Sequence, residues 1–242
     1  MTDIAGKPLA VAEPLILCLE TGGDICSVAL ARGGETVALR ESREREHAEC
    51  LSTFIDEILE QFGVSYKEID AVAVSAGPGS YTGLRIGTAT AKGICYGADK
   101  PLIAIDSLLS LATLCERSDP DAIYCPMIDA RRQEVYTALF DASTRKLRAT
   151  MAVIVTEDSF AEILDDHRMC FFGSGAAKCG KIIVHPNAAF VNVESSAAGL
   201  SAPAAKAYAN QRFENSAYYE PFYLKDFVAT TRGKKSITAK NK

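Results

Sequence analysis

Three glycines and a proline interrupt the chain between residues 77 and 83, in the segment Gly-Pro-Gly-Ser-Tyr-Thr-Gly. The apolar residues 71–75 before it are typical of a buried strand, and the pattern of 84–96 after it is typical of a helix. A strand-to-helix turn presents backbone N–H groups at a helix N-terminus, where a phosphate or carboxylate is bound favourably. The candidate anion contacts are therefore Gly77, Gly79, Ser80, Thr82, Gly83 and Arg85.

This segment matches neither common nucleotide motif. Thr82 stands where Gly-x-Gly-x-x-Gly requires its third glycine, and the Lys-Ser or Lys-Thr pair of a P-loop does not follow. The alternative is a tight turn whose glycines permit positive φ and close packing of the helix on the strand. The spacing alone leaves both interpretations open.

A second candidate for anion contact is Asp129-Ala130-Arg131-Arg132, because arginine presents a planar fork suited to phosphate. The alternative is a polar turn in which the arginines pair with Asp129 or Glu134. The eight cysteines form no Cys-x-x-Cys pair and mostly lie in apolar runs, which favours structural thiols in a reducing compartment. The chain also has no Gly-x-Ser-x-Gly motif of a nucleophilic hydrolase.

The elements that must position these residues begin with three strands in meander order, at 15–19, 26–31 and 36–41. A helix is predicted over 47–62, where apolar residues recur every three or four positions and Gly63 follows. The glycine turn and its helix come next, then a strand at 102–105 and a helix capped by Asp106 or Ser107. This order predicts a mixed sheet with crossover helices over roughly the first 115 residues.

The second half is predicted to be a smaller, degenerate α/β unit, with a boundary near Asp119-Pro120. The elements expected there are strands at 123–128, 135–140, 153–155 and 170–172, a short helix at 160–164, a turn at 173–175 and a closing helix at 201–213.

Small residues form two rows on the helix that follows the glycine turn. One row holds Gly83, Gly87 and Ala91, and the other holds Ala89, Gly93 and Gly97. A glycine inside a helix costs up to about 1 kcal/mol relative to alanine, so close neighbours on two sides are expected. The sheet is one neighbour; the other is the helix at 47–62 or a helix of another subunit.

The composition is that of a globular protein, with 48% hydrophobic and 24% charged residues in 242. A formal charge of −5 argues against a body that grips a polyanion by itself, so a partner would supply most of any contact with RNA. The first residues hold no sustained apolar segment, so we expect neither a signal peptide nor a membrane anchor. This favours a cytoplasmic location. The basic residues of 229–242 are expected to be disordered, either brushing RNA or only solvated.

Several segments together resemble the TsaB (YeaZ) family of bacterial tRNA threonylcarbamoyladenosine biosynthesis, over about residues 15–223. They are Leu17-Cys18-Leu19-Glu20-Thr21, Ser27-Val28-Ala29-Leu30, His47, 77–87, Ala91-Lys92-Gly93 and 129–136. The resemblance implies an α/β protein of the actin-like ATPase (ribonuclease H-like) fold, similar to sugar kinases, with two related lobes of mixed sheets and crossover helices. The expected division is a flexible leader (1–14), an N-terminal lobe (15–118), a C-terminal lobe (119–228) and a basic tail (229–242).

The resemblance also implies a function. Such proteins are non-catalytic subunits that pair with themselves and with a TsaD-like catalytic paralogue. With a TsaE-like ATPase, they support formation of N6-threonylcarbamoyladenosine at position 37 of tRNAs reading codons that begin with A. No cofactor or metal is required by the chain itself; ATP or ADP is a candidate at the partner interface, and tRNA is contacted indirectly. The implied interface lies on the helices 47–62 and 84–97, at His47, Leu51, Phe54, Ile58, Ile86, Ala89, Thr90, Gly93, Ile94 and Gly97.

Two enzymatic alternatives compete with this function. A sugar-kinase-like phosphotransferase would need an aspartate after the first strand, where this chain has Glu20 and the family pattern usually has Asp. A glycoprotease-like peptidase would need the paralogue's metal-binding histidines four residues apart on a helix. His47, His167 and His185 are the only histidines, and no two have that spacing.

Overall fold

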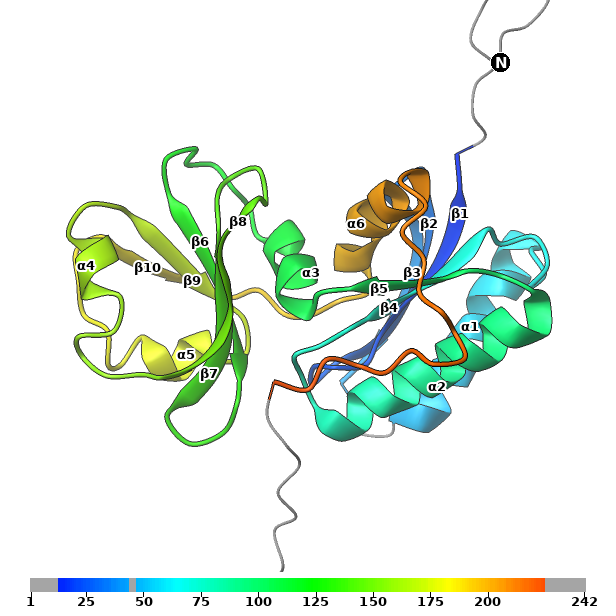
Figure 1. Ribbon diagram of the computed structural model, residues 1–242, viewed down its shortest axis with the longest axis horizontal. Helices are drawn as coiled ribbons and strands as arrows, with labels where there is room; N and C mark the ends of the chain where they lie inside the picture. The colour runs from blue at the N-terminus through cyan, green and yellow to red at the C-terminus, as the bar shows by residue number, and fades with distance from the viewer. Residues whose placement is uncertain (1–12, 44–46, 225–242) are drawn as a thin grey trace, which may run out of the picture.

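The computed structural model describes residues 13–43 and 47–224, which form two five-stranded sheets with their helices (Figure 1). The predicted leader (1–14) and tail (229–242) lie almost wholly or wholly outside these residues. The first part contains β1 (Leu15–Glu20), β2 (Cys26–Arg32), β3 (Glu35–Ser42), α1 (His47–Phe62), β4 (Ala71–Ser75), α2 (Tyr81–Ala98), β5 (Leu102–Ile105) and α3 (Ser107–Leu114). The second contains β6 (Ile123–Asp129), β7 (Glu134–Phe140), β8 (Lys146–Ile154), α4 (Ala161–Leu164), β9 (Met169–Phe172), α5 (Ala176–Cys179), β10 (Ala188–Val191) and α6 (Ala198–Ala209).

The first sheet has the order β3-β2-β1-β4-β5. The strands β1, β2 and β3 pair antiparallel, whereas β4 and β5 continue from β1 in parallel. The central strands are apolar on both faces because both faces are covered, with α1 and α2 packed on one and α6 on the other. The predicted meander followed by crossover helices is therefore confirmed.

The second sheet repeats this plan. Its order is β10-β9-β6-β7-β8, with β6, β7 and β8 antiparallel and β9 and β10 parallel to β6. In the first sheet the crossover helices have 16 and 18 residues, whereas α4 and α5 have four each. The same topology in both sheets confirms two related α/β lobes, the second one reduced.

Several elements differ from the sequence-based expectation. The second helix begins at Tyr81 instead of Leu84, because Ser80 caps it and its Oγ accepts the Gly83 N–H at 3.3 Å. Strand β8 covers nine residues instead of three, and β10 was not expected; both strands lie at the edges of the second sheet and are only partly buried. The closing helix covers 198–209 instead of 201–213 and contains Pro203 in its interior.

The helix α6 also differs in its place. It was assigned to the second lobe by a division at 118/119, yet its Leu200, Ala204 and Ala207 are buried in the core cluster of the first sheet with Ile16 and Ala29. Sequence order does not reveal this return, because an apolar helical face indicates burial without naming the surface that covers it.

After α6 the chain runs back along the first lobe and across α2 (Figure 1). The Glu214 N–H donates to the Leu102 carbonyl at 2.8 Å, extending the sheet edge by one bridge. Lys92 of α2 then donates to the carbonyls of Ala217 and Tyr219 at 3.2 and 3.1 Å. This return brings the last described residues to the glycine turn. Among the helices that the structure describes, none combines the length and apolarity needed to cross a membrane.

Candidate functional site

The glycine turn joins β4 to α2, as predicted, and several of its polar backbone groups bond to the chain itself. The Gly77 N–H donates to the Ser107 Oγ at 3.0 Å, and the Gly77 carbonyl accepts the Ser107 N–H at the same distance. The Ser80 N–H donates to the Gly22 carbonyl at 2.8 Å. Of the predicted anion contacts, Gly77, Ser80 and Gly83 thus already have acceptors for their amides, while the side chains of Thr82 and Arg85 are exposed.

Three segments approach this turn so closely that side chains would not fit. A Cβ at Gly77 would overlap the Phe222 carbonyl oxygen, and one at Gly83 would overlap the Thr21 carbonyl oxygen. A Cβ at Gly79 would lie 2.6 Å from the Gly22 carbonyl oxygen. The glycines are therefore accounted for by close backbone packing, the second of the two interpretations that the sequence left open.

Glu20 stands at the end of β1, beneath the turn, and is only 2% exposed. Its Oε1 accepts the Gly22 N–H at 2.6 Å and the Ser75 hydroxyl at 2.9 Å. The neighbouring Thr21 donates its hydroxyl to the Gly83 carbonyl at 2.7 Å. These bonds join β1, β4 and α2, so the carboxylate is used to hold the first loop against the turn.

The two small-residue rows of α2 have different surroundings. The row of Gly83, Gly87 and Ala91 is buried against the sheet, and Gly87 approaches the Thr21 hydroxyl. Gly93 and Gly97 are exposed, and no atom lies within 4 Å of a Cβ built on either. At these positions the neighbour expected from the sequence is therefore not the chain's own α1.

The other predicted interface residues divide by exposure. Leu51 and Ile58 are buried in the core of their own lobe and offer no surface to a second chain. The side chains of Phe54, Ile86 and Ile94 are half-buried against that core. Thr90 is also half-buried, whereas Ala89 is exposed. His47 is the first residue of α1, and its side chain lies outside the described part of the structure. The exposed part of this face is completed by Tyr96, which the sequence prediction omitted and which is 90% exposed.

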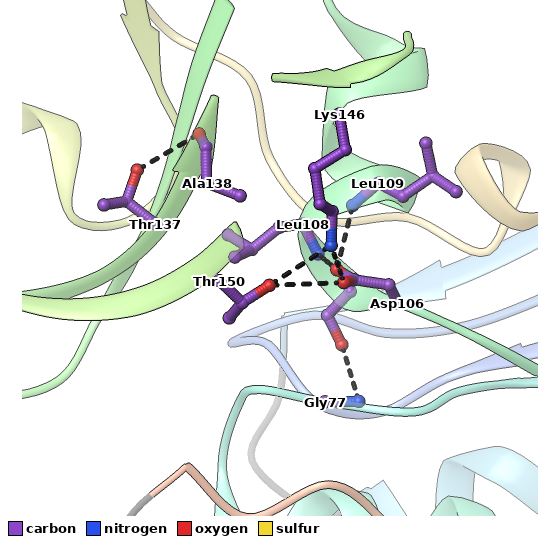
Figure 2. A network of polar contacts seen from close by, with 9 residues as sticks. Gly77, Asp106, Leu108, Leu109, Thr137, Ala138, Lys146 and Thr150 are labelled. Atoms are coloured by element: carbon purple, nitrogen blue, oxygen red, sulfur yellow. Dashed lines mark hydrogen bonds and ion pairs between the residues drawn. The ribbon is translucent and has the colours of Figure 1, made fainter. Parts of the chain in front are cut away.

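The lobes meet at α3, whose N-cap is Asp106 (Figure 2). One carboxylate oxygen accepts the N–H groups of Leu108 and Leu109 at 2.8 and 3.2 Å. The other accepts from Lys146 Nζ at 2.5 Å and from the Thr150 hydroxyl at 3.4 Å, both on β8. Asp106 thus ties the end of β5 to the second sheet, next to the Ser107 hydroxyl that holds the glycine turn.

The Asp129 segment forms the turn between β6 and β7. The sequence offered pairing of its arginines with Asp129 or Glu134 as one interpretation. Asp129 instead accepts the Arg131 backbone N–H at 2.7 Å and pairs with Lys178 of α5 at 2.5 Å. The pairing of either arginine side chain with Asp129 is therefore wrong, because a lysine distant in sequence takes that place.

Other chemistry has little support in the described residues. No three histidine, cysteine, aspartate or glutamate side chains there lie close enough to hold a metal ion. Burial raises the pKa of Cys18, Cys26, Cys125 and Cys170 to about 12, which makes these thiols poor nucleophiles. Two surface hollows of about 700 and 820 Å³ lie along α6, and no residue of the glycine turn lines either of them.

Sequence reasoning missed the residues that close the turn from outside. Ser107 and Phe222 are 30 and about 145 residues away from Gly77, so local patterns could not identify them. Thr21 and Gly22 carried a weak signal, because they precede a second glycine at the end of an apolar strand.

Comparison with known proteins matches residues 40–233 to the family model of TsaD, tRNA N6-adenosine threonylcarbamoyltransferase. The chain is 39% identical over 121 residues to the tRNA threonylcarbamoyladenosine biosynthesis protein TsaB of Haemophilus influenzae, covering 50% of this chain and 51% of that protein. It is 38% identical over 123 residues to TsaB of Escherichia coli K12, covering 51% and 53%. The chain thus spans about half the length of the curated relatives it matches.

A solved structure extends this similarity to the whole fold. It is that of an uncharacterized protein from Pseudomonas aeruginosa with similarity to peptidase YeaZ. The two chains are 25% identical with a TM-score of 0.75, and the match covers 88% of this chain and 100% of the other. Both lobes are therefore shared with that protein.

Proposed function

The chain belongs to the family of TsaD, tRNA N6-adenosine threonylcarbamoyltransferase, and on this premise we propose that it is a TsaB-type subunit supporting threonylcarbamoylation of tRNA. The modified position would be adenosine 37 of tRNAs reading codons that begin with A. The similarity to two proteins named TsaB supports this choice within the family. Free cysteines at all eight positions fit action in the cytoplasm.

In this proposal the chain is non-catalytic and acts through a TsaD-like partner and a TsaE-like ATPase. This proposal is supported by the state of the side chains that a reaction would need, which are either missing from the sequence or already bonded. The sequence has no histidine pair four residues apart, and the carboxylate of Glu20 is buried and bonded to Gly22 and Ser75. A nucleotide, ATP or ADP, would then be bound at the surface shared with the partner, and this chain would need no cofactor of its own.

The observation that carries the subunit role is the exposed row on α2. Ala89, Gly93 and Gly97 leave the helix backbone uncovered along four-residue steps, with open space above both glycines. Small residues let a second helix approach closely, and each glycine weakens an isolated helix, so an exposed row is explained by a helix from another chain. We place the contact with a second copy, or with the TsaD-like partner, on this face.

Reconstitution tests the role directly. Unmodified tRNA, threonylcarbamoyl adenylate as the group donor, ATP and the partner proteins are incubated with and without this chain, and the modified nucleoside is quantified. We expect modification only when chain and partners are combined. Modification of tRNA by this chain alone, or activity of the chain alone on a sugar or a peptide, would contradict the non-catalytic role.

A substitution tests the proposed face. Gly93→Leu fills the open space on α2 and should weaken self-association and partner binding in sedimentation experiments, with a matching loss of modification. Ala209→Leu is the control, because it adds apolar bulk at an exposed position of α6, on the opposite side of the sheet. Equal association of both variants, each folded by circular dichroism, would exclude the α2 face.

A further inference from the structure

The turn between β6 and β7 holds two arginines in a conformation that bulky residues rarely adopt. Arg131 has φ 70° and Arg132 has φ 52°, both in the left-handed region. In that region the Cβ atom crowds the backbone, so glycine, asparagine and aspartate are the usual residues. Two consecutive arginines are therefore an unfavourable choice for forming the turn, and a role for their side chains would account for them.

The turn is held by bonds that do not involve the guanidinium groups. The Ala130 N–H donates to the Glu134 carbonyl at 3.0 Å, and the Glu134 N–H donates to the Arg131 carbonyl at 3.2 Å. Lys178 reaches over from α5 and donates to the carbonyls of Arg132 and Glu134 at 2.8 and 2.7 Å. With the Asp129 carboxylate bound to the Arg131 N–H, the backbone is fixed from both sides.

The charged side chains of the turn also leave the two guanidinium groups without a role in holding it. Lys178 neutralises Asp129, which leaves that carboxylate without need of an arginine. Both arginines are exposed, and in the described part of the chain no ion pair or side-chain hydrogen bond engages either guanidinium. The adjacent Ser174 hydroxyl accepts the Asp129 N–H at 3.1 Å and keeps its own proton to donate. The result is a rigid tip that presents two cationic forks to the solvent.

We propose that this tip, Arg131 and Arg132, contacts the phosphate backbone of RNA, and this inference rests on the proposed role in tRNA modification. A guanidinium binds a phosphate through two parallel hydrogen bonds, and a fixed loop loses little entropy on binding. Phosphate contacts position a nucleic acid without reading its sequence, which suits a subunit that must serve several tRNAs.

The proposed role in tRNA modification, together with the local positive charge, favours RNA over an acidic protein surface. The chain is acidic overall at −5, so an RNA contact must be local. The turn between β6 and β7 and the end of the described chain at residue 224 both lie in the lower part of Figure 1. The sequence from 225 to 242 contains six lysines and arginines and one acidic residue. In this view the described chain end that precedes this basic sequence lies on the same side as the turn.

The test measures binding of unmodified tRNA to the full chain, alone and in complex with a TsaD-like partner, by fluorescence anisotropy across a range of salt. The double variant Arg131→Gly/Arg132→Gly removes both guanidiniums and suits the left-handed backbone. Its slope of log K against log salt should be shallower than that of the wild type by about 2, one for each phosphate that is no longer neutralised. Arg131→Lys/Arg132→Lys should keep most of the slope.

The matched control is Lys67→Ala/Arg148→Ala, which removes two positive charges from other exposed positions and should leave the slope unchanged. The inference is overturned if the glycine variant keeps the wild-type slope, if the control loses as much, or if neither the chain nor its complex binds tRNA. It is also overturned if the glycine variant loses only partner binding, which would indicate an acidic protein surface.

The modification assay separates this inference from the proposed function. A chain that supports no threonylcarbamoylation but shows a tip-dependent salt slope would leave the RNA contact standing and refute the subunit role. A chain that supports modification with an unchanged slope in the glycine variant would refute the RNA contact alone.

Discussion

Replacing a glycine of α2 with alanine should change the free energy of unfolding in opposite directions at two positions of the same helix. A Cβ at Gly83 would lie 3.0 Å from the carbonyl carbon of Thr21, with the carbonyl oxygen nearer still. A Cβ at Gly93 would meet nothing within 4 Å. We therefore expect Gly83→Ala to destabilise the chain and Gly93→Ala to stabilise it, at protein concentrations low enough to prevent self-association.

The magnitudes follow from three contributions. Forcing a methyl group into a close-packed contact costs about 1–3 kcal/mol. Moving the Thr21 backbone away also weakens the hydrogen bond from its hydroxyl to the Gly83 carbonyl, worth about 1 kcal/mol. Alanine returns up to about 1 kcal/mol of helix propensity at either position. The net expectation is a loss of about 1–3 kcal/mol for Gly83→Ala and a gain of about 0.5–1 kcal/mol for Gly93→Ala.

Urea unfolding of the two full-length variants and the wild type measures these changes. The midpoints should move in opposite directions while the slope m stays constant, because neither substitution alters the surface exposed on unfolding. If Gly83→Ala were as stable as Gly93→Ala, the close approach of Thr21 to α2 would be incorrect, and so would the explanation of the glycine turn by packing.

Two further predictions concern single carboxylates. Asp106→Ala should lower the free energy of unfolding by about 1–2 kcal/mol, because α3 loses its N-cap. Asp106→Asn keeps a capping side chain and loses only the partly exposed pair with Lys146, worth about 0–1 kcal/mol. Equal losses for the two variants in urea unfolding would show that the cap contributes nothing. The Ser143 hydroxyl and the Arg145 N–H lower the pKa of Asp141 from 3.8 to about 2, so its contribution to stability is present above about pH 4 and is lost as pH falls towards 2. The stability difference between the wild type and Asp141→Asn should therefore shrink over that interval, and a difference independent of pH would refute the assignment.

The sequence predicted the fold well where the pattern is local. Continuous apolar runs identified β1 and β4, and regular three-to-four spacing identified α1 with its end at Gly63. The pattern failed for β8, where the strand is defined by pairing with β7 while its own side chains are mostly exposed. It also could not predict that α6 packs on the first sheet, because that contact joins the helix to strands that precede it by about 90 residues or more.

The candidate site was predictable in position but not in its contacts. The glycines marked a place of close approach, yet the approaching atoms belong to Thr21 and Gly22, which carried only a weak signal, and to Phe222, which carried none. Likewise, the rows that start at Gly83 and at Ala89 look alike in sequence. They differ because one faces the sheet and the other faces solvent, a distinction that depends on how α2 is rotated against β4.

The repeated topology allows the same junction to be compared in the two lobes. In each sheet the central strand ends at a hairpin, and this end contacts the turn that follows the neighbouring parallel strand. In the first lobe the Gly22 carbonyl accepts the Ser80 N–H, and in the second lobe the Asp129 N–H donates to the Ser174 hydroxyl. In the first lobe this pair of loops is closed by Phe222, and an 18-residue helix follows it. In the second lobe the helix that follows has four residues. Its Lys178 donates to the Arg132 carbonyl, and the side chains of both hairpin arginines are exposed. We have proposed a partner contact on the helix of the first lobe and an RNA contact on the arginines of the second. Because the two contacts lie in different lobes, a substitution that abolishes one should leave the other intact.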